Sequence, residues 1–199
     1  MLQLKKIVGS IFSSNMFLLS DGNTSDYWII DIGDFEALKT KLPQNAQVKG
    51  IFLTHGHFDH LANINNLYNN FPELLIYTSE YGVEQLLSDK KNFSFYHEKS
   101  TIFSGSKESI VVLNNNDKIK LFDDIYLNVI ATPGHCPSCL TYYTDNYIFT
   151  GDSYIPDIKV VTNLPKGNKI QAQESVEKIK ALMGNRTICP GHGEMIITT

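Results

Sequence analysis

The amino-acid sequence predicts an α+β fold in which two β-sheets pack face to face and helices cover their outer surfaces. The first observation behind this prediction is that two strand-rich stretches are each followed by helical patterns. The second is size, because 199 residues with 42% hydrophobic side chains suffice for one substantial core. We therefore expect a single domain over residues 1–199.

The first half of the chain contains five predicted strands and three predicted helices. Short β-runs separated by turn residues predict strands at residues 3–8, 16–20, 27–31, 50–54 and 74–78. The run at 50–54, Gly-Ile-Phe-Leu-Thr, does not alternate, which indicates a strand buried on both faces. Helices are predicted at residues 35–41, from residue 61 to the pair Phe71-Pro72, and at 79–87 with Ser79 as N-cap.

The second half returns to strand patterns after an irregular stretch. Residues 89–108 show neither helical nor strand periodicity. Strands are predicted at residues 109–113, 118–122, 125–131, 140–144, 147–150, 187–189 and 195–197. The best helix candidate is 170–183, because its apolar residues recur at helical spacing and Gly184 follows at the C′ position.

The overall composition excludes several classes of protein. The net charge is −4, with 17 basic and 21 acidic residues, and no Lys/Arg block exceeds a dipeptide, so we expect no nucleic-acid partner. No apolar run approaches the roughly 18 to 20 residues that a membrane span needs. Three cysteines are too few for a disulfide-stapled secreted scaffold. We expect a cytoplasmic protein with a small-molecule substrate.

The strongest functional signal is a cluster of ligand-type side chains between a predicted buried strand and a predicted helix. The segment at residues 54–60, Thr-His-Gly-His-Phe-Asp-His, contains His55, His57, Asp59 and His60. Imidazole nitrogens and carboxylate oxygens bind zinc and similar divalent ions. The alternative is a surface patch formed by chance, but half of the six histidines lie in this one segment. A metal site is therefore the preferred interpretation.

Three further ligand candidates share one setting, a loop that follows a predicted strand. They are His135, Asp152 and His192, and glycine precedes each of them. A glycine lets the backbone approach a crowded centre and adopt positive φ where a turn needs it. Each motif alone would indicate a simple turn, but together with the histidine cluster they favour a common metal centre.

This set of motifs resembles the metallo-β-lactamase superfamily over residues 31–192. The resemblance implies a four-layer αββα sandwich of two mixed β-sheets flanked by helices, with metal ions at one edge. It implies that His55, His57 and His135 bind one ion and that Asp59, His60 and His192 bind the other. Asp152 would bridge the two ions, and Asp31 would support the histidine-rich loop without binding metal.

The implied cofactors are two divalent metal ions per chain, with zinc expected and iron or manganese as alternatives. Two such ions lower the pKa of a shared water far below its bulk value of about 15.7, so a bridging hydroxide becomes the nucleophile. Asp59 is expected to accept the proton of that nucleophile. Asp59 and Asp152 are thus the predicted catalytic residues.

The ligand set is similar to that of glyoxalase II and related thioesterases and lactonases, so we predict hydrolysis of a small thioester, lactone or related ester. Two departures from glyoxalase II argue against glutathione recognition. Only seven residues follow His192, where full-length glyoxalase II has a helical segment that contacts glutathione. The Gly-Arg-containing stretch that often follows the bridging aspartate is replaced by Ser153-Tyr154-Ile155-Pro156-Asp157.

Other readings stay open at this point. A mononuclear iron persulfide dioxygenase uses the same framework, and a phosphodiesterase or β-lactam hydrolase shares the fold. A non-enzymatic metal-binding or nucleic-acid-associated module is a third class.

The roles of several single residues also have two interpretations each. Tyr154 either donates a hydrogen bond to substrate or only packs. The aromatic residues of 89–108, with His97, form either an apolar wall or an ordinary surface loop. We expect Cys136 and Cys139 to be buried thiols rather than a redox pair.

Overall fold

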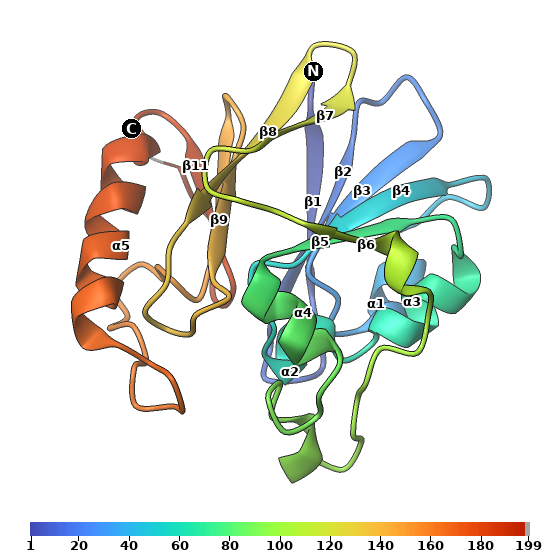
Figure 1. Cartoon of the computed structure of the whole chain (residues 1–199). Coiled ribbons are helices and arrows are strands. Elements are labelled where there is room, and N and C mark those ends of the chain that lie inside the picture. The colour runs from blue at the N-terminus through green and yellow to red at the C-terminus, as the bar shows by residue number, and fades with distance from the viewer. Residues whose placement is uncertain (198–199) are drawn as a thin grey trace.

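The computed structural model describes residues 1–197, which form two six-stranded mixed sheets (Figure 1). The first sheet has its strands in chain order: β1 (Gln3–Val8), β2 (Asn15–Ser20), β3 (Asp26–Ile30), β4 (Gln47–Phe52), β5 (Leu75–Thr78) and β6 (Ile110–Val112). Strands β1 to β3 form an antiparallel meander, and β3 to β6 run parallel. The three strands predicted at the N-terminus are therefore present and form a meander.

The second sheet is built from the rest of the chain. Its strands, in chain order, are β7 (Lys118–Phe122), β8 (Ile125–Ala131), β9 (Leu140–Tyr143), β10 (Tyr147–Gly151), β11 (Thr187–Pro190) and β12 (Ile196–Ile197). Neighbouring strands are antiparallel except β10 and β11, which run parallel. Both sheets are thus mixed, as the family resemblance implied.

Helices cover the outer face of each sheet, and the two groups lie on opposite sides in Figure 1. The helices are α1 (Phe35–Lys39), α2 (Phe58–Leu61), α3 (Ile64–Asn70), α4 (Glu80–Leu86) and α5 (Lys169–Met183). Apolar residues of α1 to α4 join the core on the outer face of the first sheet, and Ile179 of α5 packs on the second. No described helix is both long and apolar enough to cross a bilayer.

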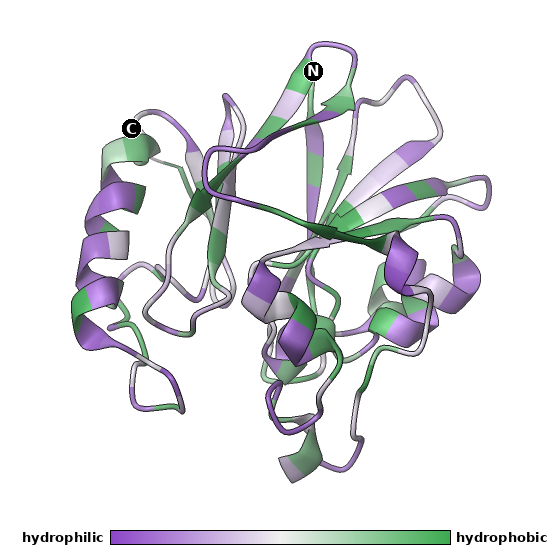
Figure 2. Ribbon diagram, viewed as in Figure 1, coloured by the Kyte–Doolittle hydropathy of each residue, from purple (hydrophilic) through white to green (hydrophobic). Residues whose placement is uncertain are grey.

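The alternation of side chains along the strands builds the core between the sheets. Trp28 and Ile30 of β3 belong to the inter-sheet cluster, whereas Ile29 between them packs toward the helices. Phe52 of β4 contacts Tyr142 of β9 with ring centroids 5.4 Å apart, which joins the two sheets. In Figure 2 hydrophobic residues gather where β4, β5 and β6 meet, and hydrophilic residues make up much of α5.

The helix expected from residue 61 is present as α3 but begins only at Ile64, and a separate short helix, α2, precedes it. The loop that follows β3 contacts the backbone at the break between α2 and α3. Ile32 N–H donates to the carbonyl of His60 (2.8 Å), and Asn63 N–H donates to the carbonyl of Ile32 (3.1 Å). Those backbone groups would otherwise bond within a continuous helix, so the insertion ends α2 early and fixes the histidine-rich loop.

The ends of several strands from both sheets meet at one edge of the sandwich. Gly191 after β11 donates its N–H to the carbonyl of Gly151 (2.9 Å) at the end of β10. Leu140 at the start of β9 donates to the carbonyl of Thr54 (2.8 Å) after β4. These contacts bring together the loops that carry the predicted ligand side chains.

Candidate metal centre

The seven side chains that the sequence singled out lie together at this edge. They form three groups whose ligand atoms lie within 4.8 Å of one another: His55, His57 and His135; Asp59, His60 and His192; and His55, His60 and Asp152. The first two groups match the two ligand sets that the family resemblance implied. The third group joins Asp152 to one member of each set.

Asp152 faces both ligand sets through different oxygen atoms. Its Oδ1 lies 3.5 Å from His60 Nε2 and 3.6 Å from His192 Nε2. Its Oδ2 lies 3.6 Å from His135 Nε2. One carboxylate is therefore placed between two groups of imidazoles, which is the arrangement that a bridging ligand requires.

The spacing between imidazole nitrogens fits shared coordination of a small cation. His57 Nδ1 lies 2.9 Å from His135 Nε2, and His60 Nε2 lies 3.3 Å from His192 Nε2. Two nitrogens bound tetrahedrally at the usual zinc distance would lie about 3.3 Å apart. The donor atoms are therefore close to the separation that one metal ion would impose on each pair.

Three buried side-chain atoms of the candidate ligands, His55 Nε2, His57 Nε2 and Asp152 Oδ1, lack a hydrogen-bond partner among the described residues. An unsatisfied buried polar atom is destabilising, so its presence in a folded protein calls for an explanation. A bound cation would satisfy these atoms, and the donor set of imidazoles and carboxylates suits a divalent ion.

Three of the histidine rings are oriented by acceptors on their outer nitrogen. His60 Nδ1 lies 2.8 Å from Asp31 Oδ2, and His135 Nδ1 lies 2.8 Å from the carbonyl of Val161. His192 Nδ1 lies 3.1 Å from the carbonyl of Phe12. A carbonyl can only accept, so Nδ1 carries the proton in His135 and His192. This leaves Nε2 with a free lone pair directed into the centre.

Asp31 connects the end of β3 to the histidine-rich loop. It is buried, and its Oδ1 accepts the N–H of Thr54 while Oδ2 accepts the Thr54 hydroxyl, both at 2.7 Å. Asp31 itself has a left-handed backbone, with φ of 58°. Its position agrees with the supporting role that the resemblance implied.

Burial and mutual charge determine the protonation of the cluster. Burial lowers the pKa of His60, but the carboxylates of Asp59 and Asp31 outweigh it and hold that pKa well above its usual range. Burial raises the pKa of Asp152, yet the charge of His60 keeps it below the usual value. Burial also lowers the pKa of His55 well below its ordinary value. Ionised Asp152 and neutral His55 are in the forms that bind cations, whereas His60 would have to release its proton on binding one.

Two of the glycines next to ligand residues are required by close packing. Gly134 has φ of 136°, and a Cβ there would strike the backbone of Ala172 in α5. A Cβ on Gly191 would strike the carboxylate of Asp152. The expectation that these glycines allow close backbone approach is confirmed at both positions.

Sequence reasoning missed several residues that hold the ligands in place. Phe12 and Val161 act through main-chain carbonyls, which carry no side-chain signature. The hydroxyl of Ser14 donates to the carbonyl of Asp59 at 2.7 Å. Phe12 and Ser13 both have positive φ, of 50° and 54°. Only Thr54 carried a signal, since it precedes the histidine cluster directly.

The aromatic residues of 89–108 lie partly at the centre and partly at the surface. The ring of Phe93 lies 5.0 Å from that of His57, so this residue contributes to an apolar wall. His97 stacks on Phe58 with centroids 5.0 Å apart and belongs to none of the three ligand groups. Phe95 and Tyr96 are exposed. Phe93 thus lies beside a candidate ligand, whereas Phe95 and Tyr96 lie at the surface.

Tyr154 and the cysteine pair have packing roles. Tyr154 packs beside α5 against the apolar cluster of Ile148 and Ile179. Cys136 and Cys139 are buried free thiols, as expected, with Sγ atoms 3.3 Å apart.

Comparison with known proteins identifies the family. A family model described as the metallo-beta-lactamase superfamily matches residues 11–192. The solved structure of BLEG-1 B3 metallo-beta-lactamase is 25% identical, with a TM-score of 0.86, and the match covers 98% of this chain and 94% of that one.

Two further solved structures show the same fold. A di-iron-bound form of TTHA1623 is 20% identical with a TM-score of 0.79, covering 97% of this chain and 94% of that one. ETHE1 from Myxococcus xanthus is 19% identical with a TM-score of 0.74, covering 98% and 79%. The family model spans most of this chain, and the histidine and aspartate groups lie together at one sheet edge. This chain therefore belongs to the metallo-beta-lactamase superfamily.

Proposed function

We propose that this protein is a glyoxalase II-like, metal-dependent hydrolase of small thioesters, lactones or related esters. The observation that carries the proposal is the position of Asp152, whose two oxygens face different imidazole sets at 3.5 to 3.6 Å. A carboxylate at that position suits a centre with two ions. Hydrolysis through such a centre needs no serine or cysteine nucleophile.

In this proposal each ligand set holds one divalent ion. His55, His57 and His135 would bind the first, and Asp59, His60 and His192 the second, with Asp152 between them. When bound, two such ions supply hydroxide from water near neutral pH and polarise the carbonyl of the substrate. We expect zinc, and the di-iron-bound TTHA1623 makes iron the first alternative to test.

The chain's own residues orient the ligands and accept the proton that the attacking water releases. Asp59 Oδ2 lies 3.1 Å from His192 Nε2 and 3.3 Å from His60 Nε2, and its side chain retains some solvent exposure. We assign to its carboxylate the proton released by the attacking water. The ring of Phe93 lies 5.0 Å from that of His57 and supplies apolar surface beside this candidate ligand.

The test is a combined measurement of metal content and turnover. Purified protein is stripped with a chelator, reloaded with zinc, iron(II) or manganese, and assayed against a thioester, a lactone, a phosphodiester and a chromogenic β-lactam. We expect thioester or lactone hydrolysis that requires metal, and Asp152→Ala and His57→Ala should lower both metal content and rate. Full activity in either variant, or thiol-dependent oxygen uptake with one iron per chain, would contradict the proposal.

A β-lactam hydrolase is the second candidate. It is favoured by the likeness to BLEG-1, described as a B3 metallo-beta-lactamase, which extends over nearly all of both chains. The chromogenic β-lactam arm of the same assay tests it directly. Turnover of the β-lactam well above that of the thioester would favour this candidate over the first.

A further inference from the structure

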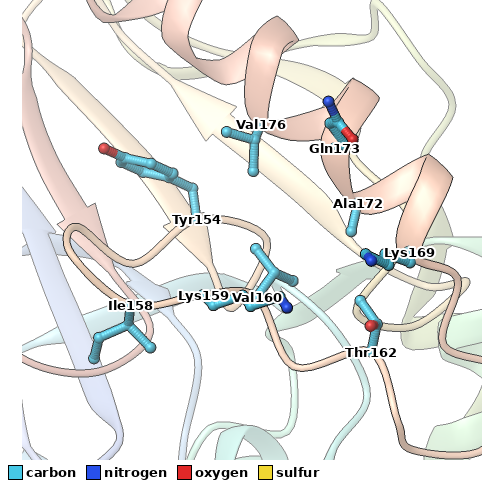
Figure 3. A pocket seen from close by; sticks show the side chains of 9 residues that line it. All are labelled: Tyr154, Ile158, Lys159, Val160, Thr162, Lys169, Ala172, Gln173 and Val176. Carbon is cyan, nitrogen blue, oxygen red and sulfur yellow. The ribbon is translucent and has the colours of Figure 1, made fainter.

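A cavity of about 270 Å³ lies between the segment that follows Asp152 and the first turns of α5 (Figure 3). Its lining residues are Tyr154, Ile158, Lys159, Val160, Thr162, Lys169, Ala172, Gln173 and Val176. In Figure 3 the ring of Tyr154 lies at one end beside Val176, and Lys169 lies toward the other. None of these residues is one of the seven candidate ligands.

This cavity adjoins the metal centre. A second cavity, of about 20 Å³, is lined by the candidate ligands His135 and Asp152. Three residues, Ile158, Lys159 and Val160, line both cavities. Because the same short segment lines both, the larger cavity is a neighbour of the one that contains His135 and Asp152.

The walls of the cavity are joined to the loop that carries His135. The carbonyl of Val161 accepts from His135 Nδ1 at 2.8 Å. At the start of α5, Asn168 N–H donates to the carbonyl of Gly134 (2.7 Å), and the Ser175 hydroxyl donates to the carbonyl of Pro133 (2.6 Å). Both the segment and the helix are therefore held in fixed positions relative to the candidate metal ligand.

The lining favours an apolar group that ends in a negative charge. Ile158, Val160, Ala172 and Val176 supply aliphatic surface. The charged residues that line the cavity are Lys159 and Lys169, and no carboxylate lines it. Among the described residues neither lysine forms an ion pair. Two unpaired ammonium groups beside an aliphatic surface would bind an anionic end of an apolar chain.

The surroundings of the cavity also indicate a binding region. Ile158, Val161, Leu164 and Ile170 are all exposed, although they are large apolar residues within a short part of the chain. Such groups of exposed apolar side chains commonly mark ligand or partner sites. The cavity is slightly smaller than the typical range for ligand pockets, about 300 to 1,000 Å³, so it suits a short chain rather than a bulky peptide.

We propose that this cavity binds the acyl half of the substrate, a short aliphatic acyl group that carries a terminal carboxylate. The inference rests on the proposed function, since the scissile carbonyl must lie at the metal centre next to Asp152. In the reaction, the oxygen of water bonds to the acyl carbon as the carbon–sulfur bond breaks. The sulfur takes a proton and leaves as a thiol, and the dicarboxylate remains.

The test compares acyl groups on one small thiol, using the zinc-loaded full chain. We expect kcat/KM to rise about tenfold or more from acetyl to hexanoyl, because four further methylene-sized groups are buried. Adipoyl has the same length as hexanoyl and carries a terminal carboxylate, so its kcat/KM should be higher than that of hexanoyl. A flat dependence on chain length, with acetyl hydrolysis still measurable, would overturn the cavity assignment and leave the proposed function standing.

Two variants with matched controls identify the site. Val176→Phe fills the cavity, so it should remove the preference for hexanoyl and adipoyl while acetyl hydrolysis is retained. The control Glu174→Phe, on an exposed face of α5, should change neither the acyl preference nor the rate of acetyl hydrolysis. Lys169→Gln should remove the advantage of adipoyl over hexanoyl, and the exposed control Lys178→Gln should keep it. Equal effects of a variant and its control would contradict the assignment.

A binding measurement separates this inference from the proposed function. Calorimetric titration of adipate and hexanoate into the wild-type protein needs no turnover. Adipate should bind more tightly than hexanoate, and Val176→Phe should abolish binding of both. If no thioester is hydrolysed but adipate binds in this way, the cavity assignment stands and the hydrolase proposal fails. Absence of adipate binding to a folded wild-type protein would overturn the cavity assignment.

Discussion

Asp31 and His60 form a fully buried pair, in which carboxylate Oδ2 lies 2.8 Å from imidazole Nδ1. The same carboxylate accepts two hydrogen bonds from Thr54, at the start of the histidine-rich loop. One side chain thus connects the end of β3, the loop after β4 and a candidate metal ligand. This relationship explains how two sheet strands fix the direction of one imidazole.

We predict that Asp31→Asn lowers metal affinity by about 10- to 100-fold, the usual effect of losing a carboxylate that orients a ligand histidine. The amide retains the shape of the side chain but no longer carries the charge that faces His60. Metal affinity is measured by competition with a chromogenic chelator. Asp26→Asn, in β3 at a partly exposed ion pair with Lys49 of β4, is the control. Unchanged affinity in Asp31→Asn would show that the pair is only structural.

Removal of metal should lower the melting temperature of the wild-type protein. His55 Nε2 and Asp152 Oδ1 are buried without a hydrogen-bond partner among the described residues, so a bound ion stabilises the folded state selectively. At a thousandfold excess of metal over its Kd, the stabilisation is about 4 kcal/mol. Scanning calorimetry with chelator and with zinc measures the difference. An identical melting temperature in both conditions would argue against a metal ion at these atoms.

Most of the fold could be predicted from sequence because local patterns determine it. The alternation at Trp28, Ile29 and Ile30 reflects a strand with one face toward the second sheet and one toward helices. The break between α2 and α3 could not be predicted, since it depends on hydrogen bonds with Ile32, from a loop far away in the sequence. The periodicity of hydrophobic residues indicates which side chains are buried, but it does not predict such long-range backbone contacts.

In the candidate site, too, some residues could be predicted from local sequence and others could not. His135, Asp152 and His192 were recognisable because ligand-type side chains follow strands and stand next to glycine. The carbonyls of Phe12 and Val161, which orient two of the imidazoles, were not, since every residue has a carbonyl. The cavity beside α5 also depends on loop packing that no periodic pattern encodes.

Gly134→Ala should destabilise the protein and reduce its activity together. A Cβ at this position strikes the backbone of Ala172, so α5 must move away from the loop that carries His135. We expect a loss of about 1 to 3 kcal/mol of unfolding free energy, from both the crowding and the positive φ. Urea denaturation and turnover measure the two effects.

Gly184→Ala is the matched control for this substitution. Gly184 also has positive φ, but its Cβ would meet only a distant arginine nitrogen at 3.9 Å. This variant should therefore lose stability through backbone strain alone and keep its metal affinity. If Gly134→Ala binds metal as well as Gly184→Ala does, the contact with α5 does not position His135.

The three cysteines should be unreactive in the native protein. Cys136, Cys139 and Cys189 are exposed by 1%, 2% and 0%. Because thiol reagents need access to the sulfur, we expect no rapid labelling until the chain unfolds, and then labelling of all three. A colorimetric thiol reagent with and without denaturant gives the counts. Labelling of only one thiol after unfolding would mean that Cys136 and Cys139 had formed a disulfide.

Asp34 should stabilise the protein in a pH-dependent way. It is the N-cap of α1, where its carboxylate accepts the N–H groups of Ala37 (3.0 Å) and Ser10 (3.1 Å). Burial raises its pKa, but these hydrogen bonds outweigh burial and lower the pKa below the usual value of 3.8. Because the folded-state pKa is the lower one, the stabilisation is present above the unfolded-state pKa and is lost as the pH falls through the folded-state value.

Two substitutions separate the cap from the charge. Asp34→Ala should cost about 1 kcal/mol at neutral pH, because it removes the cap. Asp34→Asn keeps a good cap but cannot titrate, so the stability difference between wild type and this variant should shrink as the pH falls below about 4. The difference between Asp34→Ala and Asp34→Asn should not change over the same range. Urea denaturation at several pH values measures all three proteins, and a constant gap between wild type and Asp34→Asn would contradict the assigned role of the charge.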